Sequence, residues 1–88
     1  MGRYEMGADA GTMALGQPTA DSLFELGMIY SAGREVVADM VAAHKWFNLA
    51  CAKGKREAAV YREEVAREMS SFEIADAQRA AREWLKTH

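Results

Sequence analysis

Small and apolar residues recur at helical spacing in four successive segments of this chain, and this pattern constrains the fold more than any other feature. Positions i, i+3, i+4 and i+7 lie on one face of an α-helix, so residues with that spacing form a stripe that packs against a neighbour. β-branched residues are scarce and there is a single proline, which also favours helix over strand. The sequence therefore predicts an all-α fold. The four stripes comprise Leu23, Leu26, Gly27 and Tyr30; Ala43, Trp46, Phe47 and Ala50; Ala58, Tyr61, Val65 and Met69; and Ile74, Ala77, Ala81, Trp84 and Leu85.

Capping and terminating residues set the expected boundaries of these helices at about 20–32, 39–53, 56–69 and 71–86. Gly33 and Gly54 follow the first two stripes, where a left-handed residue commonly ends a helix. Asp39 stands where the second helix needs an N-cap. Ser70 and Glu73 have the spacing of a capping box at the start of the fourth helix. Short connections favour antiparallel neighbours, so we expect paired helical hairpins, with the last helix as a C-terminal cap.

The first 18 residues differ from the rest of the chain. They contain four glycines followed by Pro18, and each glycine costs a helix roughly 1 kcal/mol relative to alanine. We interpret 1–18 as a flexible N-terminal arm and 19–88 as one helical repeat domain.

Composition excludes several classes of function. The formal net charge of −2 argues against a nucleic-acid-binding protein, because such domains usually carry a basic excess. No stretch reaches the ~18 consecutive apolar residues that a membrane span needs. Cys51 is the only cysteine, so no intramolecular disulfide can form. These features favour a cytoplasmic protein without nucleic-acid or membrane partners.

The segment from Leu26 to Gly54 resembles one unit of the Sel-one-like repeat (SLR) family, which is related to the tetratricopeptide repeat. The resemblance covers about a third of the chain. It departs from the family at Glu35, where a glycine is usual, and at Val37, where a proline is common. The family positions are matched by Leu26, Gly27, Tyr30, Gly33, Val36, Asp39, Ala43, Trp46, Phe47, Ala50 and Gly54.

The sizes of the matched residues explain their spacing. Small residues allow two antiparallel helices to approach closely, and aromatic side chains fill the wedge between them to interior density. We therefore expect a structural role for the matched positions. The small ones are Gly27, Ala43 and Ala50, and the large ones are Tyr30, Trp46 and Phe47.

The resemblance implies a protein-protein interaction module or adaptor, since helical repeats hold partners on the surface lined by the first helix of each unit. The first helix is apolar around most of its circumference, and we expect its contact surface to include Ser22, Glu25, Met28 and Ile29. Three or more units are usually needed for stability, and this chain holds about one and a half. The N-terminal arm, a second copy in a weak homodimer, or the protein partner could stand in for the missing neighbour. The alternatives are the C-terminal capping part of a longer repeat scaffold and a small ligand-binding or hydrolytic domain.

No residue pattern indicates catalysis, a cofactor or a metal. His44 and Cys51 lie seven residues apart on one expected helix, which separates them by roughly 10 Å. Two such residues are too few for a metal site and too distant for a nucleophile and its base. We interpret them as an exposed histidine and a small structural cysteine, and we expect a non-enzymatic protein.

Overall fold

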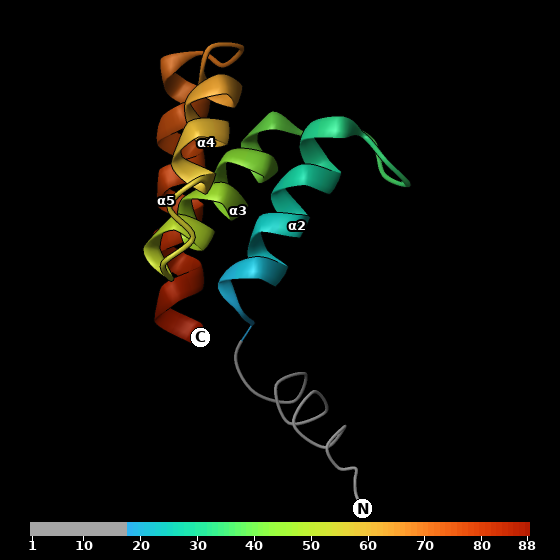
Figure 1. Cartoon of the computed structure of the whole chain (residues 1–88). Coiled ribbons are helices and arrows are strands. Elements are labelled where there is room, and N and C mark those ends of the chain that lie inside the picture. The colour runs from blue at the N-terminus through green and yellow to red at the C-terminus, as the bar shows by residue number, and fades with distance from the viewer. Residues whose placement is uncertain (1–17) are drawn as a thin grey trace, which may run out of the picture.

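The computed structural model describes residues 18–88, so the segment 1–18 interpreted as an arm lies, apart from Pro18, outside the described residues. The described part is all-helical, as predicted, with α2 (Ala20–Ala32), α3 (Met40–Ala52), α4 (Ala58–Ala66) and α5 (Ser71–Thr87). Successive helices run in opposite directions (Figure 1). Helix α3 occupies the centre, because it packs against each of the other three and most extensively against α2.

Polar caps fix the ends of the α2–α3 hairpin. Gly33 ends α2 in the left-handed region at φ 72°, and its N–H donates to the carbonyl of Ile29. A carboxylate oxygen of Asp39 accepts a hydrogen bond from the backbone N–H of Ala42 at 3.0 Å. The Asp39 N–H in turn donates to the carbonyl of Tyr30, which ties the loop back to α2. The predicted roles of Gly33 and Asp39 are confirmed.

Helices α4 and α5 differ in their N-terminal caps. Helix α4 is shorter than the predicted 56–69, because Glu57 supplies no side-chain cap and the residues that flank the helix form tighter turns. Helix α5 opens with the predicted capping box. The Ser70 hydroxyl accepts from the Glu73 N–H at 3.1 Å, and the Glu73 carboxylate accepts from the Ser70 N–H at 2.8 Å.

Phe47 is the central core residue, and it lies against the notch that Gly27 leaves in α2. A Cβ atom at position 27 would lie 2.5 Å from two atoms of the Phe47 ring. Phe24 and Tyr61 flank the same ring, each with a centroid separation of 5.7 Å. The close approach of α2 and α3 therefore depends on one glycine facing one aromatic ring. The fully buried neighbours of Phe47 in the core include Leu23, Ala43, Ala50 and Ala58.

Trp46 takes a different position from the one its sequence spacing indicated. Its indole is half-buried and packs edge-to-face on Trp84 of α5, with ring centroids 6.0 Å apart. Position 46 follows Ala43 by three residues, but the turn of α3 directs it toward α5 rather than toward α2. Phe47 fills the α2–α3 wedge, and Trp46 joins α3 to the last helix.

Candidate functional site

The structure separates the four residues expected on the contact surface of α2. Ser22 and Glu25 are exposed, and Ile29 is half-buried. Met28 instead packs against the hydrophobic core. The Ser22 backbone N–H donates to the Thr19 hydroxyl at 3.0 Å in the N-cap of α2, and the Ser22 hydroxyl donates back to the Thr19 carbonyl at 2.9 Å. Glu25 and Ile29 are the pair that the fold brings together.

Glu25 and Ile29 line a hollow of about 560 Å³ together with Arg34 and Glu35 from the following loop. Glu35 adopts φ 67°, a left-handed conformation that is uncommon for a residue with a side chain. Its position is the one at which the resemblance would place a glycine. The fold thus sets an apolar residue among three charged ones at one end of α2.

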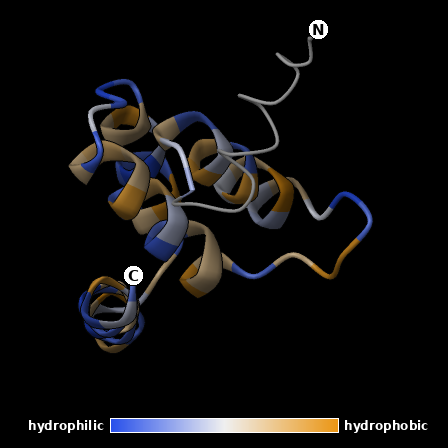
Figure 2. Cartoon of the chain, turned by 90° about the horizontal axis from the view of Figure 1, so that it is seen from below, coloured by the Kyte–Doolittle hydropathy of each residue, from blue (hydrophilic) through white to orange (hydrophobic). Residues whose placement is uncertain are grey.

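The loop that follows this hollow exposes apolar surface. Figure 2 shows it projecting from the helices with an orange, hydrophobic stretch. Val37 is 89% exposed and Val36 is 37% exposed. The two valines add apolar surface beside the partly apolar hollow.

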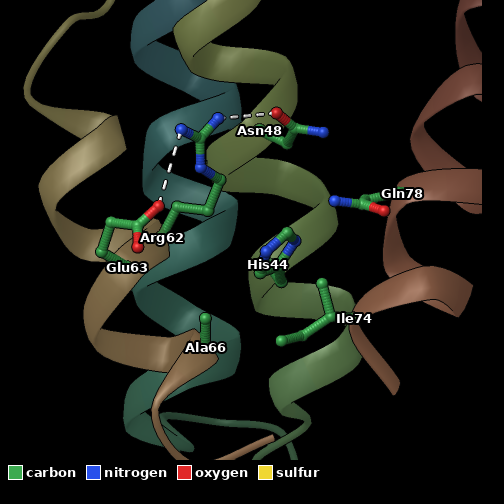
Figure 3. A pocket seen from close by; sticks show the side chains of 7 residues that line it. All are labelled: His44, Asn48, Arg62, Glu63, Ala66, Ile74 and Gln78. Atoms are coloured by element: carbon green, nitrogen blue, oxygen red, sulfur yellow. Dashed lines mark hydrogen bonds and ion pairs between the residues drawn. The ribbon is translucent and has the colours of Figure 1, made fainter. Parts of the chain in front are cut away.

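A second hollow, of about 360 Å³, lies between α3, α4 and α5, and the sequence did not indicate it. Its side chains converge from all three helices (Figure 3). An Nη1 N–H of Arg62 donates to the Asn48 side-chain oxygen at 2.8 Å, and Nη2 of Arg62 lies 3.9 Å from the Glu63 carboxylate. The lining residues are His44, Asn48, Arg62, Glu63, Ala66, Ile74 and Gln78.

His44 is the most unusual member of this second hollow. It is 4% exposed, so the interpretation of His44 as an exposed histidine is wrong. Its Nδ1 is buried and has no hydrogen-bond partner within residues 18–88. Burial lowers the pKa of His44, the positive charge of Arg62 lowers it further, and the carboxylate of Glu63 partly opposes both. The ring is therefore neutral at pH 7.

The sequence carried one signal of this burial. The α3 sequence from Met40 to Ala52 has apolar residues on several faces, so more than one neighbour must cover it. A helix covered from three sides buries positions outside its main stripe. His44 directly follows Ala43 and lies on the side that α4 and α5 cover.

The second hollow is lined mainly by polar side chains. No cluster of three or more His, Cys, Asp or Glu side chains able to hold a metal ion occurs in residues 18–88. Cys51 is half-buried and packs against the core. Hydrogen-bond donors and acceptors line the second hollow. Two of its side chains, Arg62 and Glu63, carry opposite charges, and the amides of Asn48 and Gln78 are uncharged.

In the part of the chain that the structure describes, no helix combines the length and the apolar character that crossing a bilayer requires. Comparison of the chain with known protein families, with curated proteins and with solved structures found no match.

Proposed function

We propose that this protein is a protein-protein interaction module that binds its partner through the outer side of α2 and the loop after it. One observation carries the proposal. Within residues 18–88, the extensive helix contacts of α2 are with α3 alone, so the side of α2 away from α3 has no helix packed on it.

The chemistry of this side supports a protein partner. The half-buried Ile29 supplies an apolar centre, and Glu25, Arg34 and Glu35 form a charged rim around the hollow. Protein interfaces commonly combine an apolar centre with a polar, solvated rim. The exposed Val37 extends the apolar area along the loop.

The resemblance of Leu26 to Gly54 to an SLR unit supports the same proposal. In a helical repeat, the first helix of each unit lines the binding surface, and α2 is the first helix of the resembling unit. A reducing, cytoplasmic setting fits the single cysteine, and we include it in the proposal.

The test is affinity capture with the intact chain as bait, comparing the parent with Ile29→Asp. A carboxylate at the centre of the surface leaves an unpaired charge in the interface, so we expect partners captured by the parent to be lost. Val60→Asp is the matched control, because Val60 is 59% exposed on α4, away from this surface. Circular dichroism establishes that both variants fold. Equal capture by Ile29→Asp and the parent would remove the outer side of α2 from consideration.

A second candidate is the C-terminal capping part of a longer repeat scaffold. Helix α5 favours it, because Ala77 and Ala81 are its buried residues and most of its other positions are exposed and polar or charged. Terminal repeats need a polar outer side for solubility. In that case substitutions on the outer side of α5, such as Arg82→Ala, leave partner capture unchanged.

A further inference from the structure

We propose that the hollow between α3, α4 and α5 is a binding site for a small uncharged molecule bearing a carboxamide group, held by Asn48, Gln78 and His44. This site is separate from the outer side of α2, and its ligand does not depend on the function proposed for that surface.

The charges at the hollow compensate one another. Arg62 and Glu63 contribute one positive and one negative charge, and Arg62 already donates to Asn48 and lies 3.9 Å from Glu63. A bound ion would meet one attracting and one repelling charge from this adjacent pair, and desolvating a charge is costly unless it is paired. The hollow therefore favours an uncharged ligand over an anion or a cation.

The remaining polar groups are amides and an imidazole. The Asn48 oxygen accepts from Arg62, which leaves the Asn48 amide nitrogen to donate. Figure 3 shows the Gln78 amide extending from α5 toward α3, across the hollow from Arg62. A carboxamide has one acceptor oxygen and two donor hydrogens, so it can pair with side-chain amides in both directions.

The His44 ring can pair with either a hydrogen-bond donor or a hydrogen-bond acceptor of a ligand. The hydrogen bond at one ring nitrogen normally fixes which nitrogen carries the proton. Nδ1 of His44 has no such bond within the described residues, so the interior of the fold does not select the tautomer. The neutral ring can present a donor or an acceptor to the hollow. A bound ligand would select one of the two neutral tautomers of His44.

The volume and the apolar lining of the hollow indicate which group the carboxamide of the ligand is attached to. Its volume of about 360 Å³ is at the lower end of the range for small-molecule sites. Ile74 and Ala66 supply apolar surface beside the amides. A carboxamide attached to a compact ring or short alkyl group matches this combination.

The test compares benzamide with benzoate and benzamidinium, which have nearly the same shape and carry charges of zero, minus one and plus one. The intact chain, labelled with 15N at histidine, is titrated with each probe at neutral pH and followed by NMR. We expect benzamide to bind tightest and to shift His44 toward one tautomer. His88 is the internal control, because it is exposed at the end of α5 and its ring stacks on Trp84.

Two substitutions at Gln78 sharpen the test, since this residue is exposed and its replacement leaves the core intact. Gln78→Leu removes the amide pair and should weaken benzamide about threefold to tenfold, the effect of one neutral hydrogen bond. Gln78→Glu should reverse the preference toward benzamidinium. Arg82→Gln, an exposed change on α5 outside the hollow, should leave benzamide binding unaltered.

Three results would overturn the proposal. The first is benzoate or benzamidinium binding the parent as tightly as benzamide. The second is a saturating benzamide signal that leaves His44 unmoved or that survives Gln78→Leu unchanged. The third is the absence of any His44 shift up to the solubility limit of benzamide.

Discussion

Replacing Gly27 by alanine should destabilise the protein, even though alanine is the better helix former. In a helix interior this change alone would stabilise by about 1 kcal/mol. Here the new Cβ would lie 2.5 Å from two ring atoms of Phe47 and 2.9 Å from a third. The Phe47 ring is fully buried between Phe24 and Tyr61, so it has no room to withdraw. Overpacking costs about 1–3 kcal/mol, and a confined ring places this case at the upper end.

The net loss is then about 2 kcal/mol, which for a domain of this size lowers the melting temperature by roughly 8–16 °C. Thermal and urea unfolding followed by circular dichroism measure it. Phe47→Leu is the informative background, because the smaller side chain makes room for the added methyl group. In that background Gly27→Ala should be neutral or stabilising. A Gly27→Ala protein as stable as the parent, or one with the same loss in both backgrounds, would refute the proposed contact.

Three further predictions test other parts of the fold. Ser70→Ala should lower the free energy of unfolding by about 1 kcal/mol through loss of the α5 cap, while the adjacent Ser71→Ala should cost less, as measured by urea titration. Phe47→Ala should cost about 3–5 kcal/mol, and Trp46→Ala should cost less because its indole is half-buried. The pKa of His44 in the folded protein lies below its ordinary value of 6.5. As the pH falls, the unfolded chain therefore takes up a proton at His44 before the folded protein does. Stability should therefore be full above pH 6.5 and fall as the pH drops below it, and a His44→Leu variant should reduce this slope.

The candidate sites were predictable to different degrees. Glu25 and Ile29 followed from the excess of apolar residues on the first helix, and they share a hollow. Met28 belonged to the same excess, but its side chain turns inward and packs against the core. The hollow around His44 was not predicted, because its residues come from three helices and their spacing along the chain carries no pattern.

By itself the sequence determined the local structure of the described chain: helical stripes, the Asp39 and Ser70 caps, and the end of α2 at Gly33. Each of these rests on residues within one or two turns of each other, where backbone geometry and short hydrogen bonds decide the outcome. Tertiary structure decided which helix each face meets. Because α3 is covered from three sides, Trp46 contacts α5, and His44 is buried with no partner for its Nδ1 among residues 18–88. Those outcomes depend on the packing angles between helices, which periodicity along a single helix does not encode.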